Sequence, residues 1–295
     1  MQKKMYYRNG VFIDETDGIP YDGADEINTE HPFMLHPLGF PIFIPRHILS
    51  DCNEYNNGDP YTVRENINNE FHQRRINSTV RLLKGIVTAE SRILDIGCGE
   101  GYITAEIAKR LDMKDICGLD CSLSAIEKAK SSFPQIELAV ADAYDPPYPD
   151  SFFDVIVCNN LWEHVPDPLS LLTNISRISK PDGFLIISTP SRYRFENLIR
   201  VFMGKSVKLV TQNHVTEYSV GQVKEQLRYG GYDVLEAKSQ SLKYSPGGIK
   251  HFIAYRIVKP LLQLYMGLVN SNHSLETTVF FLAKKLKQQM KKMGF

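Results

Sequence analysis

Three glycines at alternate positions follow directly behind a short apolar run. The segment RILDIGCGEGYIT, residues 92–104, places Gly97, Gly99 and Gly101 between a run with strand character and a run with helical spacing. Glycine weakens regular structure, so this spacing indicates a tight turn that needs left-handed backbone or close approach to a ligand. The order strand, glycine-rich turn, helix is typical of α/β folds that bind nucleotide-like ligands at the carboxyl ends of parallel strands.

Strand and helix patterns alternate after this turn. Strands are expected at 92–96, 115–120, 136–142, 152–160, 183–189 and 277–285, with helices at 101–111, 122–133, 167–179 and 219–230. Alternation of this kind predicts a parallel sheet with helices on both faces. Asp167 is the expected N-cap of its helix, with Pro168 in the first turn. Ser124 and Glu127 show capping-box spacing in the helix that begins at 122.

The glycine spacing separates two classes of cofactor. A dinucleotide-binding turn follows the pattern G-x-G-x-x-G/A, whose last position would fall at 102, where this chain has Tyr102. The pattern here is D-x-G-x-G-x-G, with Asp95 two residues before the first glycine. A carboxylate at that position favours a ligand with positive charge over a pyrophosphate. A nicotinamide dehydrogenase is therefore the weaker alternative.

Four segments in register resemble the class I S-adenosylmethionine-dependent methyltransferases. LDIGCGEG resembles the first motif of that family, GLDCS the acidic end of its second strand, ADA at 141–143 its adenine-binding turn, and SKPDGFLIIST the turn before its fifth strand. The resemblance implies a Rossmann-like, doubly wound α/β sheet that is mostly parallel with an antiparallel last strand. It also implies S-adenosylmethionine as cofactor, with Asp120 on the ribose hydroxyls and Asp142 on the exocyclic amine of adenine.

Other segments are similar to the ubiquinone-biosynthesis O-methyltransferases. NNLWEHVPDP at 159–168, NHVTEYS at 213–219 and HQRRIN at 72–77 carry this similarity, which spans about residues 72–243. It implies that Arg75 contacts the cofactor carboxylate, with Arg74 as the alternative. Residues 1–60 and 247–270 lie outside the similarity and are expected to determine the acceptor, so a quinone acceptor does not follow.

The cofactor-binding prediction combines these motifs with the end of the fourth strand, where Asn159 can meet the methionine moiety. The predicted residues are Arg75, Asp95, Gly97, Cys98, Gly99, Asp120, Cys121, Asp142, Ala143 and Asn159.

Two histidines are the candidates for the chemical step. A hydroxyl acceptor must lose its proton during methylation, and an imidazole with a pKa near neutrality is a natural general base. His164 follows the fourth expected strand and His214 the fifth, so both border one edge of the sheet. For His164, a structural function in the turn before Asp167 stays open. The remaining histidines, including His72, are interpreted as surface or packing residues.

The same segment offers a metal site as an alternative. Some related enzymes bind a divalent cation through E-x-x-E-H and a later histidine, but this chain reads N-L-W-E-H, so Asn160 replaces the first glutamate. Glu163, His164 and His214 remain as one carboxylate and two imidazoles. The prediction is a site without metal, with these three residues as the alternative ligand set.

Two regions lie outside the expected core pattern. Residues 1–61 are predicted to form an irregular N-terminal extension that packs on the core. Residues 62–295 form the predicted methyltransferase domain, with an apolar helical insert at about 247–270 that Pro260 breaks. A packed cap over the core is the favoured interpretation of the insert. A substrate lid and a membrane-touching helix are the alternatives.

Composition limits the classes of partner and the compartment. Lys and Arg number 34, as do Asp and Glu, and this zero net charge does not favour a nucleic-acid binder. The beginning of the sequence has no signal-peptide pattern, and the five cysteines form no CxxC pair, so a cytoplasmic protein with reduced thiols is expected. Peripheral membrane contact through the insert stays open.

Together these observations predict a methyltransferase that uses S-adenosylmethionine. Its expected acceptor is the hydroxyl of a small-molecule, lipid-like or glycan compound. An N-methyltransferase and a non-catalytic binding subunit with the same fold are the alternatives.

Overall fold

The computed structural model describes residues 5–8, 11–14, 20–21, 34–44, 70–240, 252–269, 271 and 274–287. Most strands in these ranges belong to one large sheet. They are β4 (Met34–Leu35), β5 (Pro41–Ile42), β6 (Ile93–Ile96), β7 (Ile116–Asp120), β8 (Glu137–Val140), β9 (Phe153–Asn159), β10 (Ser179–Pro190), β11 (Tyr232–Gln240) and β12 (Thr278–Lys285). Within the described ranges, their order is β11-β12-β10-β9-β6-β7-β8-β5-β4.

The pairing directions in this sheet match the expected architecture. Strands β6 to β10 pair in parallel wherever they are neighbours, whereas β12 runs antiparallel to both β10 and β11. The strand order reverses between β6 and β9, and open parallel sheets bind ligands at such a switch point. The predicted α/β fold with an antiparallel last strand is therefore confirmed.

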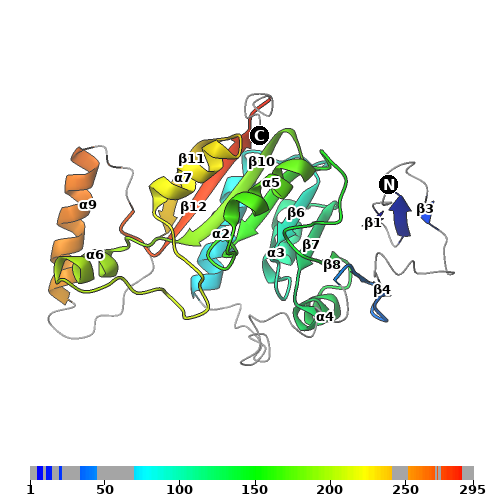
Figure 1. Cartoon of the computed structure of the whole chain (residues 1–295), viewed down its shortest axis with the longest axis horizontal. Helices are drawn as coiled ribbons and strands as arrows, with labels where there is room; N and C mark the ends of the chain where they lie inside the picture. The colour runs from blue at the N-terminus through cyan, green and yellow to red at the C-terminus, as the bar shows by residue number, and fades with distance from the viewer. Residues whose placement is uncertain are drawn as a thin grey trace.

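Two helical layers cover the sheet (Figure 1). One face carries α2 (Glu70–Lys84), α3 (Tyr102–Leu111) and α4 (Leu123–Ser132), and the other carries α5 (Pro168–Ile178) and α7 (Val220–Tyr229). Alternate strand residues serve the two layers, as period-two side-chain alternation requires. Leu94 packs with the α5–α7 layer, while its neighbour Ile93 packs with the α2–α4 layer.

The two predicted helix starts have different outcomes. Asp167 caps α5, because its Oδ1 accepts hydrogen bonds from the N–H groups of Leu169 and Ser170 at 3.1 and 3.0 Å. In α4 the prediction of Ser124 as the cap is wrong, since Ser122 accepts from the N–H of Ala125 at 3.2 Å. The cap lies two residues before Ser124 because the helix follows the end of β7 almost directly.

Short strands occur within the N-terminal 61 residues. β1 (Met5–Arg8), β2 (Val11–Asp14) and β3 (Pro20–Tyr21) form a separate three-stranded sheet. β5 extends the large sheet beside β8, and Phe40, Ile42 and Ile44 are buried in its core. Residues 40–44 thus pack against the core, whereas the packing of the whole N-terminal extension on the core stays a prediction. The proposed boundary at residues 61–62 lies outside the described ranges and stays a prediction.

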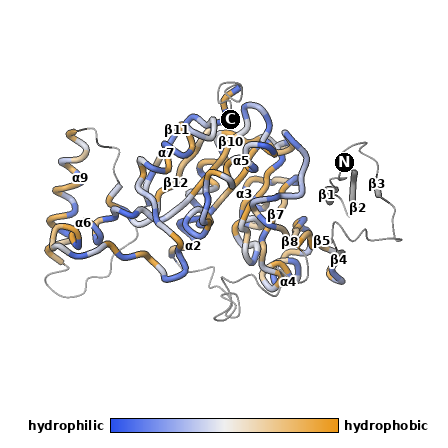
Figure 2. The backbone as a smooth tube through the Cα atoms, in the orientation of Figure 1, coloured by the Kyte–Doolittle hydropathy of each residue, from blue (hydrophilic) through white to orange (hydrophobic). Residues whose placement is uncertain are grey.

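The helical insert differs from its prediction. A π-helical turn, η2 (Ala254–Val258), continues into α9 (Lys259–Leu268), so Pro260 does not break the helix. Proline fits here because the widened turn accommodates its ring, and its missing N–H falls at the start of α9. Neither η2 nor α9 has a buried residue, so the described part of the insert is not a packed cap. It lies beside α6 (Phe195–Phe202), and Figure 2 shows hydrophobic residues along both helices.

None of the helices in the described ranges has both the length and the apolarity that a bilayer span requires.

Candidate functional site

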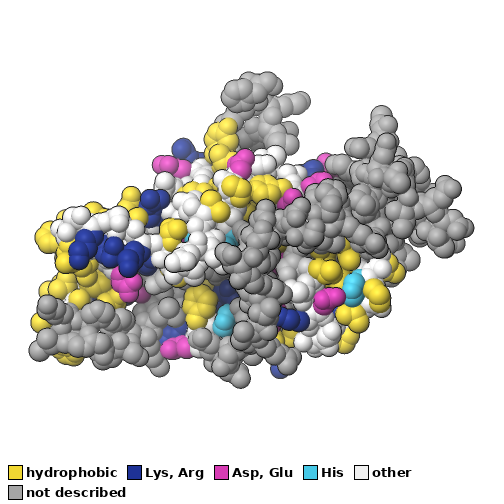
Figure 3. Space-filling view, turned by 60° about the horizontal axis from the view of Figure 1, so that its bottom comes forward, with side chains coloured by type: hydrophobic (Ala, Val, Ile, Leu, Met, Phe, Trp, Pro, Cys, Tyr) yellow, Lys and Arg dark blue, Asp and Glu magenta, His cyan; other side chains and the backbone are white. Residues whose placement is uncertain are grey.

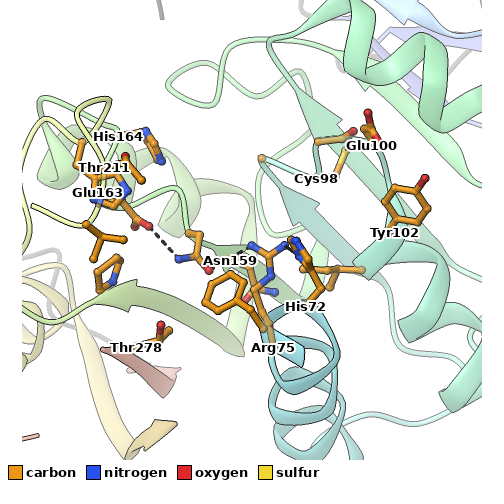
Figure 4. Close-up of a pocket in the computed structure, with 18 of the residues that line it drawn as sticks. His72, Arg75, Cys98, Glu100, Tyr102, Asn159, Glu163, His164, Thr211 and Thr278 are labelled. Atoms are coloured by element: carbon orange, nitrogen blue, oxygen red, sulfur yellow. Dashed lines mark hydrogen bonds between the residues drawn. The ribbon is translucent and has the colours of Figure 1, made fainter. Parts of the chain in front are cut away.

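A cavity of about 370 Å³ lies at the carboxyl ends of β6 and β9. It brings together most of the predicted site residues from distant parts of the chain. These residues are Arg75, Asp95, Gly97, Cys98, Gly99, Asn159, Glu163, His164 and His214. In Figure 4 the glycine-turn residues lie on one side of the cavity and Glu163 and His164 on the other, with Arg75 of α2 between them.

The glycine turn has the backbone conformation that its sequence predicts. Gly97, Gly99 and Gly101 have φ angles of 72°, 55° and 75°, in the left-handed region that favours glycine. The turn is held by Asp120 at the end of β7, whose Oδ2 accepts a hydrogen bond from the N–H of Gly99 at 2.8 Å. This contact fixes the part of the turn that faces the cavity.

Asp95 is a buried carboxyl group at the wall of the cavity. Burial raises its pKa to about 7, although the hydrogen bond from Thr104 and the positive charge of Arg75 act in the opposite direction. The Oγ1 of Thr104 donates to Asp95 Oδ2 at 2.7 Å. A bound cation would offset the cost of burying the ionised carboxylate, which is the preference inferred from its place before the glycines.

Arg75 projects from α2 into the centre of the cavity wall. Its guanidinium donates to Asn160 Oδ1 at 3.3 Å and lies 3.1 Å from His72 Nδ1. The interpretation of His72 as a surface or packing residue is wrong, because it lines the cavity. The sequence contains a signal for this position, because His72 lies three residues before Arg75 on one helix and residues at that spacing share a face.

Four predicted cofactor residues are not among those that line the cavity. Asp120 and Cys121 follow β7, and Asp142 and Ala143 follow β8, so both pairs continue the same sheet edge beyond Gly99. Asp142 is exposed, and its Oδ1 accepts from the N–H of Tyr144 at 2.9 Å. Cofactor contacts at these four residues stay predictions.

Glu163, His164 and His214 form a compact cluster at the other end of the cavity, here called the Glu–His cluster. One ligand atom from each residue lies within 4.8 Å of the others, and the two imidazole centroids are 4.8 Å apart. Glu163 Oε1 accepts from Asn160 Nδ2 at 3.0 Å, while its Oε2 is buried without a hydrogen-bond partner among the described residues. Burial raises the pKa of Glu163 and lowers the pKa of His164.

The turn that carries Glu163 and His164 is held in place by the buried side chain of Trp162. Trp162 is fully buried, and its indole N–H donates to Gln226 Oε1 at 2.9 Å. Asn160 has a φ of 52°, a left-handed conformation that asparagine tolerates better than most residues. The anchored indole and this bend direct Glu163 and His164 toward the cavity.

A buried ion pair supports His214 and was not predicted. Glu217 accepts from His214 Nδ1 at 2.8 Å, from the N–H of Val210 and from Arg194. Burial alone would raise the pKa of Glu217, but these hydrogen bonds together with the charge of Arg194 lower it below its usual value. Since an ionised Glu217 can only accept, Nδ1 of a neutral His214 carries the proton and Nε2 is its basic nitrogen.

The charged side chains that line the cavity suit a zwitterionic ligand. Arg75 can hold a carboxylate, and Asp95 favours a nearby ammonium or sulfonium. The methionine moiety of S-adenosylmethionine carries these charges. Its adenosine would extend past Gly99 toward the ends of β7 and β8.

Comparison with known proteins agrees with this assignment. Residues 69–237, more than half of the chain, match a family described as methyltransferase domain. A probable S-adenosylmethionine-dependent methyltransferase of Mycolicibacterium smegmatis is 27% identical over 145 residues, which cover 48% of this chain and 52% of that protein. A ubiquinone biosynthesis O-methyltransferase of Alkalilimnicola ehrlichii is 35% identical over 108 residues, 34% of this chain and 42% of that protein. The chain thus spans about half, or less, of the length of these relatives.

Solved structures share the fold. One chain of the complex between the Haloferax volcanii Trm112 methyltransferase activator and a methyltransferase has a TM-score of 0.54 at 19% identity, over 74% of this chain and 92% of that one. An S-adenosylmethionine-dependent methyltransferase from Archaeoglobus fulgidus has a TM-score of 0.51 at 18% identity, over 71% and 93%. Because the family match covers more than half of its length, this chain belongs to the methyltransferase domain family, and its fold is that of the class I S-adenosylmethionine-dependent methyltransferases.

Proposed function

We propose that the protein methylates a hydroxyl group of a small-molecule, lipid-like or glycan acceptor. The observation that carries this proposal is the position of the Glu–His cluster, which shares one cavity with the glycine turn. Two imidazoles at the acceptor end suit deprotonation of a hydroxyl. Similarity to a ubiquinone biosynthesis O-methyltransferase over a third of the chain supports the same reaction class.

His214 is the proposed general base. Glu217 holds its Nδ1 and thereby leaves Nε2 as the proton acceptor. The negative charge of Glu217 would also stabilise the imidazolium that forms when His214 takes the proton. His164, whose pKa burial lowers, would stay neutral beside it and orient the acceptor by hydrogen bonding.

The remaining chain residues bind and orient the cofactor. Bound S-adenosylmethionine supplies an electrophilic methyl group on its sulfonium. We assign the methionine moiety to Arg75, Asp95 and Asn159, and the adenosine to Asp120, Cys121, Asp142 and Ala143. Methyl transfer to the acceptor oxygen would break the carbon–sulfur bond and release S-adenosylhomocysteine, and His214 would take the hydroxyl proton. Holding acceptor and cofactor in line accounts for several kcal/mol of the barrier reduction in such reactions.

A divalent cation at the Glu–His cluster is a second candidate. Glu163, His164 and His214 offer a carboxylate and two imidazoles at short range, and Glu163 Oε2 has no hydrogen-bond partner among the described residues. The contact between His214 and Glu217 is the support that metal-bound histidines commonly have. Such a cation would bind the acceptor oxygen and promote its ionisation.

One experiment tests the reaction class. The protein is incubated with methyl-labelled S-adenosylmethionine and paired acceptors that differ only in a hydroxyl or an amine, including a catechol, a prenylated phenol and a sugar. We expect label in the hydroxyl member of a pair. Label confined to amines would contradict O-methylation. Cofactor binding without transfer to any acceptor would favour the non-catalytic alternative.

Chelation distinguishes the two candidate mechanisms. If a cation takes part, EDTA lowers turnover and added Mg²⁺, Mn²⁺ or Zn²⁺ restores it, and calorimetry with the metal alone shows binding that Glu163→Gln removes. If His214 acts without metal, turnover is unchanged in EDTA. S-adenosylhomocysteine affinity serves as the folding control, because it depends on the other end of the cavity.

A further inference from the structure

The helical segment 252–269 presents its apolar side chains to solvent. Most of its large hydrophobic residues are more than one third exposed, with Leu261 at 61%, Leu264 at 63% and Leu268 at 75%. The other exposed members are Phe252, Ile253, Ile257, Val258, Leu262, Tyr265 and Val269. Contiguous apolar surfaces of this kind mark interaction sites in soluble proteins.

The opposite side of the same segment contacts the rest of the protein through polar side chains. Lys259 Nζ donates to Glu276 at 2.8 Å, and Gln263 donates to the same carboxylate at 2.9 Å. One turn earlier, the hydroxyl of Tyr255 donates to Glu196 of α6 at 2.7 Å. Positions 255, 259 and 263 follow helical spacing, so the polar stripe faces the protein and the apolar stripe faces outward. This orientation is the reverse of a helix that packs on a core.

The end of α6 continues the apolar surface. Phe202 is 93% exposed, and Val201 and Met203 are 51% and 59% exposed. We call these three residues and the exposed apolar residues of 252–269 the outer patch. Figure 3 shows hydrophobic side chains gathered at the end of the molecule that carries α6 and α9, with Lys and Arg beside them.

Charge distinguishes the possible occupants of the outer patch. The stretches 195–210 and 252–269 contain four Lys or Arg besides Lys259, whose ammonium pairs with Glu276, namely Arg200, Lys205, Lys208 and Arg256. Their one carboxylate, Glu196, is bonded to Tyr255. Cations around an apolar face complement an anionic lipid surface. In a two-fold interface with a second copy, the same cations would face one another.

We propose that the outer patch docks on an anionic lipid surface, with the apolar face of segment 252–269 and the tip of α6 in the interfacial layer. Segment 203–211 leads from this tip to the cavity, where Val210 and Thr211 form part of the wall. Docking would therefore place one wall of the cavity near the lipid. The proposal does not depend on the identity of the acceptor.

Vesicle sedimentation of the full chain tests the proposal. Vesicles of phosphatidylcholine alone are compared with vesicles that contain phosphatidylglycerol. We expect binding to the anionic vesicles, weaker binding at high salt because exposed charges are screened, and little binding to neutral vesicles. Leu261→Gln/Leu264→Gln removes two leucines that docking would bury in the lipid, so it should weaken binding about tenfold or more. Lys205→Gln/Arg256→Gln should weaken it on anionic vesicles only.

Leu35→Gln is the matched control, since Leu35 is 56% exposed on β4, away from the outer patch. S-adenosylhomocysteine binding should be unchanged in all three variants, which shows that each is folded and separates this test from the proposed reaction. Absence of binding to anionic vesicles, or equal binding by Leu261→Gln/Leu264→Gln and Leu35→Gln, would overturn the proposal. A dimer in sedimentation velocity that only the leucine variant dissociates, without vesicle binding, would assign the patch to a second copy instead.

Discussion

The two ends of the cavity are built in different ways. The glycine-turn end comes mainly from one continuous stretch, β6 and the turn to α3, where φ angles and the buried carboxyl groups of Asp95 and Asp120 determine the geometry. The Glu–His cluster joins two separate loops and depends on the buried pair between Arg194 and Glu217. Cofactor binding should therefore respond to local backbone changes, and catalysis to the loss of long-range contacts.

Gly97→Val should have the largest effect at the glycine-turn end. Gly97 has a φ of 72°, and an added Cβ would lie 3.3 Å from Leu161. A β-branched residue in this conformation is strained by about 1–3 kcal/mol, so we expect S-adenosylhomocysteine affinity to fall by up to about a hundredfold. Calorimetry measures this change. Gly85→Ala is the control, because a Cβ there meets no atom within 4 Å; equal affinity in both variants would contradict the prediction.

Glu217→Gln should have a slightly smaller effect, confined to the Glu–His cluster. An amide cannot stabilise the imidazolium of His214, and it leaves Arg194 without its ionic partner. We expect turnover to fall about 10- to 100-fold, with cofactor affinity unchanged within about twofold. Partial recovery of turnover in Glu217→Asp would indicate that the negative charge at position 217 stabilises the imidazolium of His214. Glu236→Gln, which removes only a surface pair with Arg81, should leave turnover unchanged. Loss of cofactor affinity in Glu217→Gln would show that the two ends are not independent.

Cofactor binding should depend on pH through the carboxyl group of Asp95. In the folded protein the pKa of Asp95 is raised to about 7, so the carboxyl group is largely protonated below that pH. A bound ammonium or sulfonium favours the ionised form. Affinity for S-adenosylhomocysteine should therefore rise about five- to tenfold between about pH 6 and 8. Asp95→Asn should remove this dependence, and an unchanged pH profile in that variant would contradict the assignment.

The raised pKa of Asp95 also affects the stability of the unliganded protein, which should be higher at low pH than at high pH. Because the folded-state pKa of Asp95 exceeds its unfolded value, the folded state binds the proton more tightly. This contribution to the free energy of unfolding is complete below about pH 4 and is lost as the pH rises through about 7. Denaturant unfolding of wild type and Asp95→Asn at pH 5 and 8 measures the difference.

The smallest expected effect is that of Thr104→Val. The hydroxyl of Thr104 donates to Asp95 Oδ2 and favours its ionised form. Removing this donor should raise the pKa of Asp95 further and lower cofactor affinity at neutral pH by a few-fold, which corresponds to about 1 kcal/mol. Calorimetry at pH 7 and at pH 9 tests this account, because the deficit should shrink at the higher pH. A deficit that is equal at both would instead indicate a packing defect.

Local sequence patterns predicted the glycine-turn end well. The spacing of Gly97 and Gly99 required left-handed backbone, and Asp95 had to lie beside it because both belong to one strand end. Asp167 was likewise recognisable as a cap from its own neighbours. Each of these features depends on residues only a few positions apart.

The other features depend on contacts that a linear pattern does not contain. Arg194 is buried because a loop that follows it at some distance in the sequence brings Glu217 to it. His72 enters the cavity through the placement of α2 against the glycine turn. The apolar stripe of segment 252–269 faces solvent because Glu196 and Glu276 bind its polar side. Periodicity identified that stripe but not the direction in which it points.

The most direct test of the account is to measure methyl transfer and cofactor affinity together in His214→Ala. His36→Ala is the control, because His36 pairs with Glu127 and does not line the cavity. With labelled S-adenosylmethionine and the best hydroxyl acceptor at saturation, we predict that turnover in His214→Ala falls by about 10²–10⁴-fold while S-adenosylhomocysteine affinity stays within about twofold of wild type. Undiminished turnover at saturating acceptor would contradict the assignment of His214 and of the Glu–His cluster as the acceptor end.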